Sequence, residues 1–288
     1  MQRFVIFAML LGPQLRIAAP PELSSVQKRL EAIEPKRFDD IARLVGLADT
    51  GPPIQVVLAP EISEVARNVS PWVAGFASSG ESMVVIFPAR TPRYPNGSLE
   101  DVLRHEVTHV LIGRASAERP VPRWFNEGLA MSAERGWRWE DEGQFVYQWA
   151  LAPVQSLADI DRMFEGGQTE QTRAYALSGA FVHDLLRREG QSFGAQILSR
   201  MNDGASFDHA FTEAAGLTPD AAEAEFWNRQ RMWTAWLPEL TSSNILWLAI
   251  TGLALIAIVR RWMRNRTIEK QWIEEGVGSD EPPPPENG

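Results

Sequence analysis

Two of the four histidines in the chain stand four residues apart, in the segment His105-Glu106-Val107-Thr108-His109. Residues four apart share one face of an α-helix, because each residue turns the helix by about 100°. Both imidazoles can therefore reach one ion, and zinc accepts such nitrogens at about 2.0–2.1 Å. Glu106 points about 100° aside, so its carboxylate is expected beside the metal as a base and not as a ligand.

The alternative for this segment is a solvated polar patch on a helix. The neighbouring residues disfavour it, because they are apolar enough to bury the helix: Leu103, Val107, Val110 and Leu111. Buried histidine and glutamate side chains need partners. The chain has no cysteine, so a zinc site here must use histidine and carboxylate ligands.

A catalytic zinc site needs a third protein ligand and leaves a fourth position for water. The best source is the segment 122–134, PRWFNEGLAMSAE, in which Pro122 can start a helix with an apolar side. Glu127 stands among these apolar residues, where a carboxylate is either salt-bridged or bound to a metal. Gly128 beside it would let another helix approach closely.

These two segments together resemble the gluzincin metallopeptidases. The motif 105–109 is followed, after seventeen intervening residues, by Glu127 within WFNEGLA. The pair is especially similar to peptidase MA-like domains, and WFNEGLA also resembles a segment of aminopeptidases. The resemblance covers about residues 50–235, and its strong motifs lie within 104–130. Residues 174–190, AYALSGAFVHDLLRREG, show a weaker resemblance to the segment that follows the third ligand in these domains.

The resemblance implies a zincin-like fold and one zinc ion per chain, bound by His105, His109 and Glu127. It also implies that Glu106 is the general base of peptide-bond hydrolysis, with a Tyr or His that stabilises the oxyanion. Tyr175 is the candidate for that donor. Its alternative is a core residue with the hydroxyl at the surface. His183 is expected to be a surface or structural residue.

Some features depart from the family pattern. There is no G-x-M-E-N segment, with which aminopeptidases hold a substrate amine, and this favours an endopeptidase. Met131 stands where some gluzincins place an acidic partner for a histidine, so Glu134 or Asp101 must orient the imidazole instead.

The remaining pattern predicts an α+β domain, with a small N-terminal sheet and a helical C-terminal part. Two short helices broken at Pro35 are expected in 22–48, and strands at 54–59 and 83–87. The strand 83–87 is either an exposed edge that pairs with substrate or an interior strand. A helix is expected over 99–113 with Ser98 as its N-cap.

Tryptophan is abundant, with 11 residues. Three of them follow the third candidate ligand: Trp137, Trp139 and Trp149. We expect these tryptophans to pack in the core. The alternatives are that they line a substrate cleft or lie against a membrane surface.

Both ends of the chain suggest a membrane protein. Residues 1–19 resemble a signal peptide, with a buried first strand or helix as the alternative. Residues 240–259 carry no charge over 20 positions, which matches the thickness of a bilayer. The span predicted is 240–262, and basic residues follow it in the tail 263–288, which is Pro-rich and expected to be disordered. The basic residues on the C-terminal side of the span predict a cytoplasmic C-terminus and an extracytoplasmic domain 20–238, which is periplasmic if the source is bacterial.

The sequence therefore predicts a membrane-anchored zinc endopeptidase that acts on peptides or proteins. The net charge of −9 argues against a nucleic-acid binder. Two alternatives stay open: an inactive zincin-fold scaffold at the membrane, and a metal-dependent hydrolase of another bond.

Overall fold

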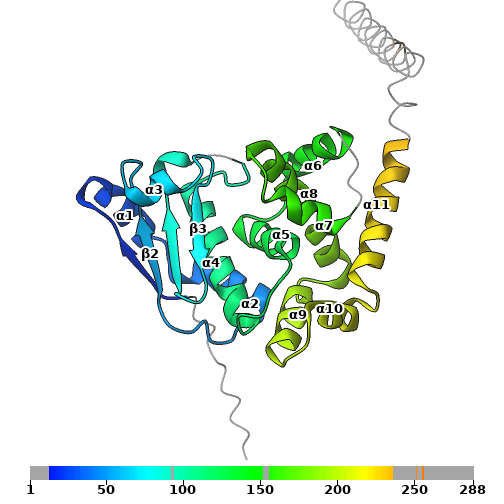
Figure 1. Cartoon of the computed structure of the whole chain (residues 1–288), viewed down its shortest axis with the longest axis horizontal. Helices are drawn as coiled ribbons and strands as arrows, with labels where there is room; N and C mark the ends of the chain where they lie inside the picture. The colour runs from blue at the N-terminus through cyan, green and yellow to red at the C-terminus, as the bar shows by residue number, and fades with distance from the viewer. Residues whose placement is uncertain (1–12, 92–93, 152–155, 236–250, 252–254, 256–288) are drawn as a thin grey trace, which may run out of the picture. The chain divides into compact units, whose positions relative to one another are not determined.

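The computed structural model describes residues 13–91, 94–151 and 156–235, together with Thr251 and Leu255 (Figure 1). The predicted span 240–262, the tail 263–288 and most of the signal-like start lie outside this part of the chain. Among the described residues, none of the helices combines the length and the apolar character needed to cross a bilayer.

A four-stranded sheet occupies the N-terminal part, in the order β1-β2-β4-β3. The strands are β1 (Leu15–Ala18), β2 (Ile54–Leu58), β3 (Gly75–Ser78) and β4 (Met83–Ile86). β1, β2 and β4 run parallel, and β3 pairs antiparallel with β4. In β2 the residues alternate between buried and exposed, as expected for a strand with one covered face.

The predicted strands at 54–59 and 83–87 are confirmed as β2 and β4. Because β4 lies between β2 and β3, the edge alternative for 83–87 is wrong and the interior alternative is right. The described sheet has two edge strands, β1 and β3, and the β3 sequence Gly-Phe-Ala-Ser has too few large apolar residues to be recognised as a strand. β1 pairs in register with Ile54–Val57, so the sheet begins inside the segment predicted as signal-like, before residue 20.

Short helices accompany the strands. They are α1 (Ser24–Glu31), α2 (Asp39–Val45) and α3 (Glu64–Asn68). A 3-10 turn at Pro35–Phe38 separates α1 from α2, as predicted from the proline. α4 (Leu99–Ala115) packs against β3 and β4, and Ser98 caps it by accepting the Asp101 backbone N–H.

The C-terminal part is helical, as predicted. It contains α5 (Arg123–Glu134), α6 (Trp139–Leu151), α7 (Leu157–Met163), α8 (Gln168–Glu189), α9 (Phe193–Asn202), α10 (Phe207–Ala215) and α11 (Pro219–Ala235). Figure 1 shows α4 between the sheet on one side and α5 on the other. α4 therefore connects the two parts of the domain.

Helices α5 and α8 approach closely at Gly128. A Cβ placed on Gly128 would lie 2.5 Å from Val182 Cγ2 and 2.7 Å from the Ser178 carbonyl oxygen. This confirms the role expected for the glycine, since any larger residue would push the helices apart. Tilted and edge-on rings fill the core beside it, among them those of Trp124, Phe125 and Phe181.

Candidate metal centre

Helix α4 presents both histidines of the motif on one face. His105 is only 4% exposed, and its ring centroid lies 4.8 Å from that of His109. The opposite side of the helix is anchored by buried residues that include Leu103 and Val107. The local sequence therefore fixes the helix in the rotation that points both imidazoles toward α5.

Helix α5 brings Glu127 to the same point. Glu127 Oε2 lies 3.3 Å from His105 Nε2 and 3.4 Å from His109 Nε2. Ligand atoms held at about 2.0–2.1 Å around a tetrahedral ion stand roughly 3.3–3.4 Å apart. The three side chains, whose ligand atoms all lie within 4.8 Å of one another, thus have the spacing that a zinc ion requires.

The other ring nitrogens also have polar neighbours. His109 Nδ1 lies 2.9 Å from Asn126 Oδ1, within hydrogen-bond distance, whereas His105 Nδ1 lies 3.4 Å from Glu134 Oε2 without the geometry of a hydrogen bond. These contacts leave each Nε2 to face the third carboxylate. Of the two acidic residues considered from the sequence, Glu134 is the one that faces His105. Asn126 was not predicted, although its position directly before Glu127 was a usable signal.

Buried cations fix the end of α5 that carries Glu134. Arg104 donates to the carbonyl oxygens of Glu134 at 2.8 Å and Ala133 at 2.6 Å, and it pairs with Asp40. Arg135 lies 3.3 Å from Glu134 Oε1. At the other end of the helix, the half-exposed Arg123 approaches Glu127 Oε1 at 3.7 Å. None of these arginines was predicted from the sequence.

Glu106 turns away from the three candidate ligands and toward the sheet. A Cβ on Gly75, the first residue of β3, would lie 3.0 Å from both Cγ and Oε1 of Glu106. Only glycine gives the carboxylate this room. Burial raises the pKa of Glu106 above its ordinary value, because the charged form is poorly solvated there. A carboxylate with a raised pKa is suited to accept and then release a proton.

The three candidate ligands are electrostatically coupled. Burial opposes the charged imidazole of His105, but Glu127 and Glu134 outweigh it and raise its pKa well above the ordinary value. The pKa of His109 is raised as well, with Glu127 outweighing the effect of burial. Burial also opposes the Glu127 carboxylate, yet the two histidines hold its pKa well below its usual range. A buried anion flanked by two imidazoles is an arrangement that a divalent cation stabilises.

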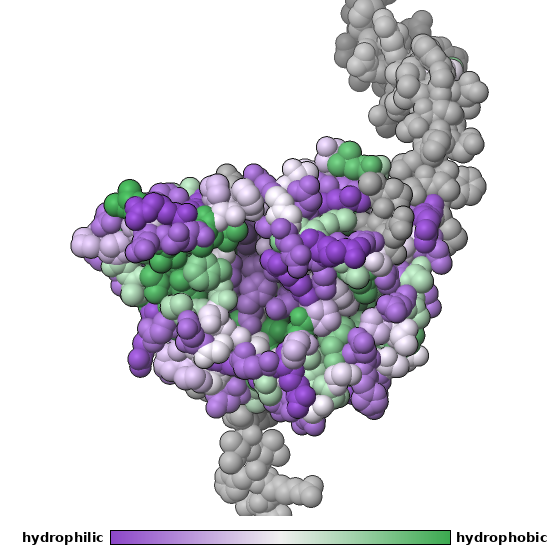
Figure 2. Space-filling model, in the orientation of Figure 1, coloured by the Kyte–Doolittle hydropathy of each residue, from purple (hydrophilic) through white to green (hydrophobic). Residues whose placement is uncertain are grey.

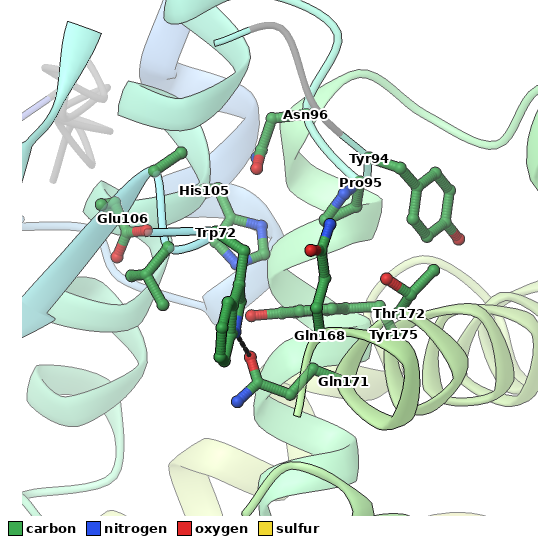
Figure 3. A pocket seen from close by; sticks show the side chains of 13 residues that line it. Trp72, Tyr94, Pro95, Asn96, His105, Glu106, Gln168, Gln171, Thr172 and Tyr175 are labelled. Atoms are coloured by element: carbon green, nitrogen blue, oxygen red, sulfur yellow. Dashed lines mark hydrogen bonds between the residues drawn. The ribbon is translucent and has the colours of Figure 1, made fainter. Parts of the chain in front are cut away.

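A cavity of about 50 Å³ opens beside Glu106. It is lined by Trp72 to Gly75 before and in β3, by Tyr94 to Asn96 before α4, by His105 and Glu106, and by Gln168, Gln171, Thr172 and Tyr175 of α8 (Figure 3). Figure 2 shows that the surface is hollowed and hydrophilic between the sheet and helices α5 and α8. The cavity thus joins residues from both parts of the domain.

Tyr175 belongs to this cavity. Its ring centroid lies 6.2 Å from that of His105, and its hydroxyl points toward Trp72 and His105 in Figure 3. Burial raises its pKa well above the ordinary value, and Glu127 and Glu106 add to this, so the phenol keeps its proton.

The other histidines lie elsewhere. His183 stacks on Trp137 at 4.9 Å and does not line the cavity, and the 65% exposed side chain of His209 contacts Glu213. Trp139 is 80% exposed and Trp149 is buried in α6. Among the described residues that line the cavity, the tryptophan is Trp72, which was not predicted from the sequence.

A model of the Peptidase MA superfamily matches residues 69–235, which is more than half of the chain and includes all of the candidate site. No curated protein and no solved structure matches the chain. The match agrees with the α+β architecture, the helical C-terminal part and the placement of the two motifs on α4 and α5. The chain belongs to the Peptidase MA superfamily.

Proposed function

We propose that this protein is a zinc-dependent peptidase of the gluzincin type that hydrolyses internal peptide bonds. The observation that carries the proposal is the spacing of 3.3 Å and 3.4 Å between Glu127 Oε2 and the two imidazole nitrogens. Glu106 stands beside this set as a separate carboxylate that is not one of its three members. Membership of the Peptidase MA superfamily supports the same chemistry.

Zinc bound by His105, His109 and Glu127 would supply Lewis acidity. It would polarise a carbonyl oxygen and lower the pKa of water to about 7. Glu106 accepts the proton of the attacking water on its carboxylate. Its raised pKa then favours delivery of that proton to the leaving amine. One residue thus serves as base and acid in succession.

Tyr175 is proposed as the oxyanion donor. A tyrosine that keeps its proton offers an O–H to the developing negative charge without becoming charged itself. The edge-on contact of its ring with Phe164, at 5.2 Å between centroids, holds it in place.

The free edge of β3 is the proposed site for the substrate backbone. An extended peptide can add to an unpaired strand edge through main-chain hydrogen bonds. β3 begins beside Glu106, so such a peptide would pass the reacting groups. Among the described residues that line the cavity there is no Lys or Arg to bind a terminal carboxylate, and this supports cleavage within a chain.

The span 240–262 is proposed to anchor the enzyme in a membrane, with the catalytic domain outside the cytoplasm. This part of the proposal rests on the uncharged stretch 240–259 and on the arginines that follow it.

The test is zinc content and hydrolysis of an unstructured protein by the full-length chain in detergent. We expect about one zinc per chain, and a loss of activity of about 10²–10⁴-fold in Glu106→Gln with zinc retained. Glu127→Ala should lose the zinc itself. His209→Ala, an exposed histidine far from the motif in sequence, is the matched control and should keep both zinc and activity.

Other outcomes decide between the alternatives. Zinc without any hydrolysis of peptides or other bonds would favour the scaffold. Hydrolysis of a non-peptide bond alone, with this activity lost in Glu106→Gln, would favour a metal-dependent hydrolase of another bond. A folded protein that binds no zinc, even after metal is added, would refute the proposed function.

A further inference from the structure

One hydrogen bond joins two residues that line the cavity beside Glu106. Trp72 Nε1–H donates to Gln171 Oε1 at 3.1 Å, as the dashed line in Figure 3 shows. Gln171 is itself fixed, because its Nε2 donates to the carbonyl oxygens of Phe164 and Gly166, both at 3.1 Å. The acceptor therefore holds the indole ring in a set position.

This bond connects opposite sides of the cavity. Trp72 belongs to the segment that leads into β3, whereas Gln171 belongs to α8, 99 residues later. Both side chains line the cavity, so their hydrogen bond limits the space between these two parts of its lining. The resulting volume of about 50 Å³ has room for a few water molecules and not for an aromatic ring.

The lining also limits the charge that can enter. Apart from His105 and Glu106, the described side chains around the cavity are uncharged. An acidic substrate group would lose its hydration there and be repelled by Glu106, while a basic group would find no carboxylate in the described lining other than Glu106, the proposed base. Asn96 Nδ2 is buried without a hydrogen-bond partner, so it can donate to a hydroxyl or carbonyl oxygen.

The direction of β3 assigns the cavity to one side of the cleaved bond. Trp72 precedes Gly75, so the cavity lies toward the beginning of the strand. A substrate that pairs antiparallel with β3 runs the opposite way and places its C-terminal side there.

We infer that the Trp72–Gln171 bridge determines specificity and admits only a small uncharged residue, glycine, alanine or serine, directly after the cleaved bond. This inference rests on the proposed peptidase function. Trp72 and Gln171 act here by limiting the size of the bound side chain and take no part in the proton transfers.

The test maps cleavage sites of the zinc-loaded full-length chain in an unfolded protein by mass spectrometry. A peptide from one of these sites is then made with Ala or Phe after the cleaved bond. We expect the wild type to cut before Gly, Ala or Ser, and Trp72→Ala to raise the Phe-to-Ala ratio of kcat/KM at least about ten-fold. Trp72→Phe keeps a ring but removes the N–H donor, so it should shift the ratio in the same direction by less. Trp139→Ala, an exposed tryptophan outside the cavity, is the matched control and should leave the ratio unchanged.

A wild type without selection for small residues, or tryptophan variants with the wild-type ratio and full zinc, would overturn the inference. If the zinc-loaded wild type cuts no peptide, the proposed function fails, and calorimetry of the two peptides on Glu106→Gln decides the inference separately. Tighter binding of the Ala peptide, lost when Trp72→Ala is added, would support it. Equal binding, or none, would refute it.

Discussion

Each histidine of the candidate centre uses both ring nitrogens. In His109, Nδ1 contacts Asn126 and Nε2 faces Glu127, while in His105 the corresponding partners are Glu134 and Glu127. The hydrogen bond with Asn126 fixes the ring of His109, and the nearby Glu134 carboxylate favours a proton on His105 Nδ1, so that Nε2 remains for a cation in both rings. At the scale of single residues, the site is therefore prepared for a cation by groups that would not touch it.

The raised pKa values of His105 and His109 predict that protons compete with zinc. A protonated imidazole cannot be a ligand, so lowering the pH through these raised values must weaken binding. For each imidazole that has to lose a proton, apparent affinity should fall about ten-fold per pH unit. Competition with a chelator from pH 8 to about pH 5.5, corrected for protonation of the chelator, measures this. An affinity that stays constant down to about pH 6 would contradict the prediction.

At the scale of elements, the site depends on the close approach of β3 to α4. The strand begins at Gly75, where the absence of a side chain leaves space for the Glu106 carboxylate. Val85 of β4 adds to the restriction, because its carbonyl oxygen would also lie 3.0 Å from a Cβ on Gly75. The sheet and the helix together thus set the position of the proposed base.

Gly75→Ala should therefore displace Glu106 and lower kcat/KM by about 10–100-fold. Zinc content should not change, because none of the three candidate ligands is among the nearest atoms that a Cβ on Gly75 would meet. Gly80→Ala is the matched control, since a Cβ there would meet no heavy atom within 4 Å. Equal activity of the two variants would show that Glu106 does not depend on the space at Gly75.

At the scale of the whole molecule, the question is where the catalytic domain works. The uncharged stretch 240–259 is followed by basic residues: Arg260, Arg261, Arg264, Arg266 and Lys270. This pattern is typical of a single transmembrane helix whose C-terminal side faces the cytoplasm. This stretch lies outside the described residues apart from Thr251 and Leu255, and the anchor is a prediction from the sequence.

The full-length chain should stay in the membrane fraction during alkaline extraction and be released by detergent. Replacing Leu248 and Leu253 with lysine should release it, because each charge near the bilayer centre costs about 2.5–3.5 kcal/mol. The same two positions changed to alanine are the matched control and should stay in the membrane. Release of the unmodified chain by alkaline buffer alone would contradict the anchor.

The sequence by itself determined the residues that bear the chemistry. Spacing along one helix fixed that His105 and His109 share a face, because helix geometry is local. Glu127 was predicted from its apolar surroundings in 122–134 and then supported by a resemblance, and β2, β4, α4 and α5 were predicted from periodicity, proline and capping signals that are local as well.

Only the tertiary structure decided what depends on contacts between distant segments. It made β3 the edge strand and β4 an interior one, since strand order is set by packing and not by local composition. It selected Glu134 over Asp101 and revealed Asn126, because the polar neighbours of the two imidazoles are fixed by how α5 meets α4. It also joined Trp72 to Gln171 across 99 residues, a contact that no periodic pattern in either segment encodes.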